Sequence, residues 1–162
     1  DCLTRFSRGM DRFDRPLFMS AFHADATIAA GPYVGGPAQL YDWAAPMHEV
    51  GQTMTHHNLL NITCDIKGDT AHTETYYLFV GSNRDGSIWQ AGGRYLDRLE
   101  KRDGEWKIAL RTNLIEWSTA AQGLPFADVL DLYANGAPAR DESDPSYQRP
   151  LRNWRAENIP AA

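Results

Sequence analysis

A strand-like segment near residues 106–117 carries an arginine and an amide among apolar side chains. Alternation along it predicts one shared face for Ala109, Arg111, Asn113, Ile115 and Trp117. A guanidinium stays charged and offers a planar fork of donors. Arg111 could therefore stabilise a developing anion or belong to a structural ion pair. Asn113 faces the same way and could bind an oxygen atom of a substrate.

Two adjacent histidines follow Thr55, where the periodicity of the sequence changes from helical to strand-like. Neighbouring residues of a strand face opposite sides, so His56 and His57 are expected on different faces. A neutral imidazole, whose pKa is about 6.5, can accept a proton near neutral pH. A histidine that faces an apolar interior is therefore a candidate general base, and we expect His56 to be structural or exposed.

Metal and nucleotide sites have no local motif in this chain. The five histidines lack the spacing of a two-His-plus-carboxylate site, and Cys2 and Cys64 have no metal-type spacing. The pair Gly92-Gly93 lacks the pattern of a phosphate-binding loop. The sequence predicts no metal site and no cofactor.

The first third of the chain is expected to be helical. Cys2, Phe6, Met10 and Phe13 recur at helical spacing, with Asp11 just off their face. A second short helix, capped by Asp14 with Pro16 in its first turn, is expected to include the residues as far as Phe22. Residues 31–37 predict a loop or a short edge strand, and a third helix is expected over about 37–48.

Strands separated by turn sequences follow the third helix. Gly68, Gly86 and Gly104 mark the turns, and strands are expected near 59–66, 71–80, 88–101 and 106–117. Three helices followed by such hairpins predict an α+β fold with a curved antiparallel sheet. The proline-rich, charged residues 136–162 are expected to form an extended C-terminal arm beyond a domain of residues 1–135.

Composition excludes several classes of function. The 162 residues carry 16 Lys and Arg against 21 Asp and Glu, a net charge of −5 that argues against binding nucleic acid or anionic membranes. No apolar run approaches the ~18 residues of a membrane helix. Two cysteines are too few for a disulfide framework, so a cytoplasmic location is expected. Because the chain begins at Asp1 without Met, further residues are expected before it.

Several segments together resemble the SnoaL-like branch of the nuclear transport factor 2-like superfamily, which includes dehydratases and a dehydrochlorinase. The resemblance covers roughly residues 3–118 and rests on the order and spacing of its segments, which are residues 5–11, 22–26, 55–61, 92–95 and 107–108. It implies a cone-shaped half-barrel, in which a curved sheet wraps three helices around a deep apolar cavity. It also implies a homodimer or homotrimer.

The resemblance also implies roles for three side chains. His57 matches the catalytic base of the family lyases, and Asp11 matches the helix acid that hydrogen-bonds this histidine and fixes its tautomer. Arg111 matches an arginine of the pocket that assists a departing anion. A structural Asp–His pair and a structural ion pair of the arginine are the alternatives.

One position departs from the family lyases, which carry Lys or Tyr five residues before the helix acid. Phe6 stands here and can neither donate a proton nor hold an anion. Another donor is then needed, and the candidates are Tyr33, Tyr76, Tyr77 and Trp89, with Tyr77 favoured because its side of the strand is more apolar. The residues expected to bind substrate or line the cavity are Phe6, Met10, Phe22, Tyr33, Trp43, Met47, Met54, Tyr77, Trp89 and Asn113.

These expectations favour a cofactor-independent lyase that acts on a small apolar aromatic or alicyclic substrate. Dehydration is the first version, and loss of halide or of formaldehyde would use similar groups. Isomerase or polyketide cyclase chemistry needs the same residues. Two alternatives are non-catalytic: a small-ligand-binding or oligomerisation domain, and the small structural subunit of an aromatic-ring dioxygenase.

Overall fold

The computed structural model describes residues 1–122 and 138–152, and three α-helices lie in the first of these ranges. The helices are α1 (Cys2–Asp11), α2 (Arg15–Ser20) and α3 (Pro37–Gly51). The carboxylate of Asp14 caps α2 by accepting a hydrogen bond from the backbone N–H of Leu17 at 2.9 Å, as the sequence predicted. The predicted third helix is present and continues to Gly51.

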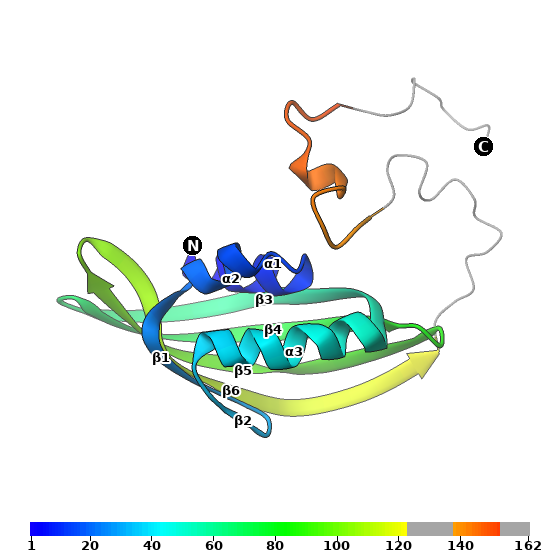
Figure 1. Cartoon of the computed structure of the whole chain (residues 1–162). Coiled ribbons are helices and arrows are strands. Elements are labelled where there is room, and N and C mark those ends of the chain that lie inside the picture. The colour runs from blue at the N-terminus through cyan, green and yellow to red at the C-terminus, as the bar shows by residue number, and fades with distance from the viewer. Residues whose placement is uncertain (123–137, 153–162) are drawn as a thin grey trace, which may run out of the picture. The chain divides into compact units, whose positions relative to one another are not determined.

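Six strands form one curved sheet that is not closed into a barrel (Figure 1). They are β1 (Phe22–Ala30), β2 (Tyr33–Gly35), β3 (Gln52–Lys67), β4 (Thr70–Asn83), β5 (Ser87–Arg102) and β6 (Glu105–Gln122). Their order across the sheet is β2-β1-β6-β5-β4-β3. The helices cover one face, here called the inner face (Figure 1). This is the α+β half-barrel that the sequence predicted.

The first strand is the main difference from the sequence-based expectation. The second helix was expected to include Phe22, but α2 ends at Ser20 and residues 22–30 form β1. β1 pairs with β6 in parallel, whereas the expected sheet was antiparallel throughout. It also pairs with β2, the predicted short edge strand. β3 begins at Gln52, earlier than the predicted strand over 59–66.

Two irregularities in the pairing of β5 and β6 change the predicted alternation along β6. One register shift falls between the pairs Arg98↔Leu110 and Leu99↔Ile108, and as a result Ile108 is fully buried although it was expected to face away from Arg111. A second shift falls between Gly92 and Gly93. Beyond it Trp117 lies against Gly92, outside the cavity that Arg111 lines.

Aromatic rings hold α1 and α2 against the inner face. Phe6 contacts Phe18, Phe22 and Tyr95 with ring centroids 5.5 to 6.0 Å apart. A Cβ atom on Gly9 would lie 2.5 Å from the backbone nitrogen of Phe18, so only glycine allows this close approach of the two helices. The ring cluster fixes α1, which carries Asp11, above the sheet.

The chain divides into two compact units, residues 1–123 and 124–162. In the second unit the described residues include a short 3₁₀ helix, Pro145–Tyr147, in which the backbone N–H of Ser146 donates to the carboxylate of Asp144. The expected boundary at 135/136 and much of the expected arm lie outside the described residues, and the extended arm stays a prediction. None of the described helices has the length and hydropathy needed to span a membrane.

Candidate functional site

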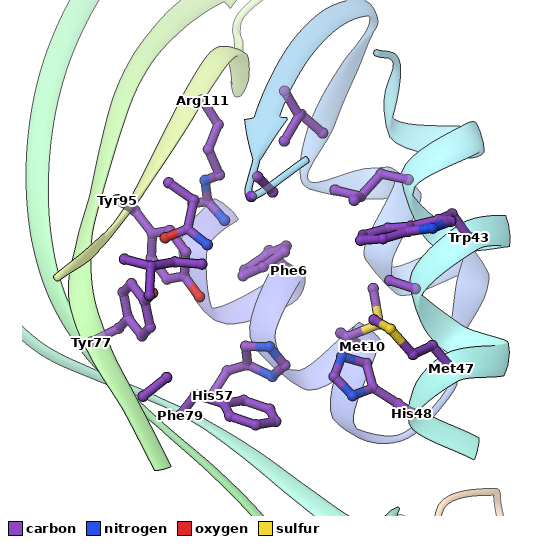
Figure 2. A pocket seen from close by; sticks show the side chains of 18 of the residues that line it. Phe6, Met10, Trp43, Met47, His48, His57, Tyr77, Phe79, Tyr95 and Arg111 are labelled. Carbon is purple, nitrogen blue, oxygen red and sulfur yellow. The ribbon is translucent and has the colours of Figure 1, made fainter. Parts of the chain in front are cut away.

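A cavity of about 230 Å³ lies between the helices and the inner face of the sheet (Figure 2). Its walls come from α1, α3, the end of β1 and the middle of β3 to β6. Three lining residues, Trp43, Met47 and Ile115, are 42 to 52% exposed and mark its opening. Because a cavity of about 150 Å³ holds benzene, this one has room for a substituted ring compound.

Asp11 and His57 meet at one end of this cavity. Oδ1 of Asp11 lies 2.6 Å from Nδ1 of His57, and Oδ2 accepts a hydrogen bond from the backbone N–H of His57 at 2.8 Å. The hydroxyl of Thr55 donates to Oδ1 at 2.9 Å. A carboxylate only accepts hydrogen bonds, so the proton of the neutral imidazole sits on Nδ1 and Nε2 is the basic nitrogen.

The local fold explains how this pair is formed. Asp11 is the last residue of α1, and Thr55 and His57 lie two residues apart on one face of β3. Burial acts to raise the pKa of Asp11, but the hydrogen bonds and charge of His57 and the hydroxyl of Thr55 outweigh it and lower that pKa. The carboxylate is therefore ionised at neutral pH. His56 is exposed on the other face, as expected.

Arg111 enters the cavity from β6 and pairs with Asp97, which was not among the predicted site residues. Its Nε and Nη2 donate to the two carboxylate oxygens of Asp97 at 2.7 and 2.8 Å. Its guanidinium carbon lies 4.2 Å from the centroid of the Phe6 ring and 4.3 Å from that of Tyr95. Burial acts to lower the pKa of Arg111, but the negative charge of Asp97 raises it.

One donor of this guanidinium stays unused among the described residues. Arg111 is 2% exposed and lines the cavity, and its Nη1 is buried without a hydrogen-bond partner in the described part of the chain. Asp97 faces Arg111 directly in the strand register. The sequence does carry a signal for Asp97. Alternation along 95–99 places it on one face between Tyr95 and Leu99, which predicts a buried carboxylate.

Tyr77, Tyr95 and Asn113 form a polar wall beside Arg111 (Figure 2 shows both tyrosines). The two tyrosine rings stack, with centroids 4.3 Å apart. Asn113 lines the cavity together with Tyr77, and its Oδ1 is buried without a hydrogen-bond partner among the described residues. The hydroxyl proton of Tyr77 is therefore not donated to that oxygen. Burial raises the pKa of Tyr77, which keeps that proton in place at neutral pH.

Most of the residues expected at the cavity do line it: Phe6, Met10, Trp43, Met47, His57, Tyr77, Trp89, Arg111 and Asn113. Tyr33 does not, because its ring stacks behind Trp43 with centroids 5.7 Å apart and its hydroxyl donates to the carbonyl of Gly36. Phe22 does not line it either, because its ring packs against Phe6 and Phe18 in the core.

Met54 was also expected at the cavity and is absent from its lining. The pairing of β3 with β4 is regular from Met54 to His57. Thr55 and His57 take the inner positions, so alternation leaves Met54 on the same side as His56.

Three lining residues that carry a ring were not predicted: His48, Phe79 and Tyr95. The apolar face of α3, continued one turn beyond Ala44, reaches His48. Alternation along β4 places Phe79 beside Tyr77. Neither pattern distinguishes a cavity wall from ordinary core, which is why they were missed. Within residues 1–122 and 138–152, no three His, Cys, Asp or Glu side chains are grouped as metal ligands would be.

Comparison with known proteins gives a family and a fold. A family model described as a SnoaL-like domain matches residues 1–112. A hexachlorocyclohexane dehydrochlorinase from Novosphingobium barchaimii is 18% identical with a TM-score of 0.67, over 76% of this chain and 88% of the other. A provisionally named scytalone dehydratase from Novosphingobium aromaticivorans is 19% identical with a TM-score of 0.65, over 76% of this chain and 89% of the other.

A third solved structure, a protein of unknown function from Mycobacterium tuberculosis, is 22% identical with a TM-score of 0.63, over 71% of this chain and 68% of the other. No curated protein matches the sequence. At these identities the solved structures establish the fold, and the chemistry has to be argued from the cavity itself.

Proposed function

The chain belongs to the SnoaL-like domain family, and from that premise we propose that it is a lyase that eliminates water from a small ring compound, with His57 as general base. One observation carries the proposal: the buried carboxylate of Asp11 holds the proton of His57 on Nδ1 and leaves Nε2 as the basic nitrogen in an apolar cavity.

Proton abstraction is the step assigned to His57. Its Nε2 takes a proton from carbon next to an activating group of the substrate, and the imidazole becomes an imidazolium ion. The ionised Asp11, 2.6 Å from Nδ1, stabilises that cation where little water competes. The pair therefore supplies both the base and the counter-ion that the base requires once it is protonated.

Arg111 is assigned the negative charge that develops on the substrate. Two of its donors are held by Asp97, which fixes the direction of the guanidinium, and Nη1 is left to bind an enolate or departing oxygen. A donor that is already fixed in place needs no reorganisation when charge develops.

Tyr77 is assigned the proton donation that Phe6 cannot provide. Burial raises the pKa of Tyr77, so the phenol is neutral at neutral pH and keeps its proton to donate. Elimination of water then runs in a balanced way: the proton leaves carbon for His57, the carbon–oxygen bond breaks, and the departing hydroxide receives the proton of Tyr77. Exchange with solvent returns both groups to their starting states.

A binding domain without turnover is the second candidate function. The bidentate pair of Arg111 with Asp97 favours it, because a charge that is already neutralised stabilises a transition-state anion less than an unpaired one. The two functions differ in one measurable property, which is whether a ring compound bound in the cavity is converted.

The test is turnover of a panel of β-hydroxy ketones on aromatic or alicyclic rings by matched histidine variants. His57→Gln is expected to lower kcat/KM by about 10² to 10⁴-fold. His56→Gln, one residue away on the exposed face, is expected to leave it unchanged. Binding of the panel without conversion by the wild type supports the second candidate, and equal activity of the two variants refutes the assignment of the base.

A further inference from the structure

The opening of the cavity carries an apolar surface that the proposed elimination does not use. Trp43 and Met47 lie about one turn apart on α3, and Ile115 comes from β6. These three side chains are 42, 47 and 52% exposed. Single exposed apolar side chains are common on proteins, but several around one opening indicate a surface that binds something.

The indole of Trp43 is held in place from behind. The ring of Tyr33 in β2 stacks on it, with centroids 5.7 Å apart and planes 18° from parallel. The hydroxyl of Tyr33 donates at 2.7 Å to the carbonyl of Gly36, the residue that caps the start of α3. A Cβ atom on Gly35 would lie 2.5 Å from that hydroxyl oxygen, so a side chain at this position would displace the ring of Tyr33.

The second face of the indole is open to a ligand. Trp43 lines the cavity, and Figure 2 shows its ring extending from α3 toward the cavity, across from Tyr77 and Tyr95. Among the described residues, Tyr33 is the one aromatic ring stacked on Trp43. Aromatic rings attract one another beyond the apolar area they bury, so a fixed indole prefers a flat ring to a puckered one of similar size.

The size of the cavity determines which part of a ligand reaches this face. A cavity of about 150 Å³ holds benzene. The cavity of about 230 Å³ therefore takes one substituted ring beside His57 and Arg111. A second ring would need roughly 150 Å³ more, so it lies at the opening, where Trp43 and Ile115 are exposed.

We propose that Trp43 is a specificity-determining residue, which binds a flat aromatic group attached to the ring that occupies the cavity. Tyr33 is its positioning residue, because it acts through the stack with Trp43. The inference rests on the proposed function only in taking this cavity as the site. It adds a substrate class: two-ring compounds whose polar ring enters the cavity and whose second, flat ring covers the opening.

The test is calorimetric binding of 4-phenylphenol and 4-cyclohexylphenol to the whole chain. Both substituents are apolar six-membered rings, but only the phenyl group is flat. The wild type is expected to bind 4-phenylphenol about fivefold more tightly, the effect of one stacked pair of rings. Trp43→Leu, which stays apolar but lacks the ring, is expected to abolish this preference. Trp117→Leu is the matched control and should keep it, because Trp117 is similarly exposed but lies against Gly92 outside the cavity.

Tyr33 is tested by a pair of variants of its own. Tyr33→Leu removes the ring behind the indole and is expected to reduce the preference by about half. Tyr33→Phe keeps the ring and is expected to keep most of the preference, which a general loss of packing would not explain. If Trp43→Leu does not fold, these two variants decide.

Equal binding of the two phenols by the wild type, or no binding of either, overturns the inference, and an opening that is already covered in solution gives this result. A preference that persists in folded Trp43→Leu, or unchanged in Tyr33→Leu when that variant decides, also overturns it. So does a preference that Trp117→Leu abolishes equally.

Binding is measured without turnover, so the two proposals fail separately. A protein that prefers the flat two-ring phenol but converts nothing refutes only the lyase proposal. A protein that dehydrates ring substrates without this preference refutes only the role of Trp43.

Discussion

Asp11 and His57 are joined by two contacts, from Oδ1 to Nδ1 at 2.6 Å and from Oδ2 to the backbone N–H at 2.8 Å. With the hydroxyl of Thr55, three donors point at one carboxylate. The backbone contact fixes the position of the β3 strand against α1, and the side-chain contact fixes the proton of the imidazole. One carboxylate therefore sets both the fold and the chemistry at this point.

The first prediction replaces that carboxylate by an amide. Asn has a single accepting oxygen for the three donors, so in Asp11→Asn the amide nitrogen faces either a backbone N–H or the imidazole, which disfavours the required tautomer. We expect kcat to fall by roughly 10³-fold or more. Asp14→Asn, which keeps the helix cap, is the control and should retain full activity in the same assay. Activity of Asp11→Asn close to that of wild type contradicts the assigned tautomer.

The second prediction concerns stability at low pH. The pKa of Asp11 is lower in the folded state than its ordinary value of 3.8. The ionised group therefore stabilises the folded protein at pH values above 3.8. The contribution is lost as the pH falls through the lowered pKa of the folded state. The difference in free energy of unfolding between wild type and Asp11→Asn should therefore be largest near neutral pH and shrink below about pH 3.8. Urea unfolding at several pH values measures it, and a constant difference argues against the shift.

The third prediction separates the structural part of Arg111 from its chemical part. Arg111→Met leaves the carboxylate of Asp97 buried and unpaired, at a cost of about 3 to 5 kcal/mol in the free energy of unfolding. Arg111→Met combined with Asp97→Leu should recover most of that loss, because an apolar pair often replaces a buried ion pair without cost. Activity should stay low in the double variant, which lacks Nη1. Recovery of both stability and activity would show that the pair is purely structural.

The fourth prediction concerns proton donation to the leaving group. Tyr77→Phe keeps the ring stacked on Tyr95 and removes only the hydroxyl. We expect kcat to fall by about 10 to 100-fold for elimination of water, and less for a substrate of the same skeleton with a better leaving group, because proton donation matters most for a poor one. Equal losses for the two substrates, measured side by side, would point to a role in packing.

Local patterns predicted α1 and α3 because their apolar faces repeat at helical spacing, and they predicted β4 to β6 because turn sequences bound them. β1 was missed because residues 22–30 are rich in alanine and carry a charged residue, which disfavours a strand in isolation. The strand exists because its backbone pairs with β6 on one side and β2 on the other. Such pairing depends on strands that are distant in the sequence, so the residues of β1 themselves carry no pattern that predicts it.

In the site, too, contacts between segments that are distant in the sequence were the ones not predicted. Asp11, His57 and Arg111 were named from a family resemblance, and the structure places all three beside one cavity. Asp97 was not named, because alternation indicates that it is buried but does not show that it pairs with Arg111 in the next strand. The error at Met54 has a local cause, because alternation from an inward-facing His57 already places Met54 on the opposite face.

The parallel pairing of β1 with β6 also determines the order in which the protein can assemble during synthesis. β1 leaves the ribosome well before β6, its partner toward the middle of the sheet, which is the last of the described strands to be made. Until β6 has emerged, the rings around Phe6 lack part of the surface that buries them, and Asp97 lacks its cation. The nascent chain therefore carries an unfinished aromatic surface until β6 is made, and chaperones that bind apolar segments should engage it before residue 111 emerges rather than after.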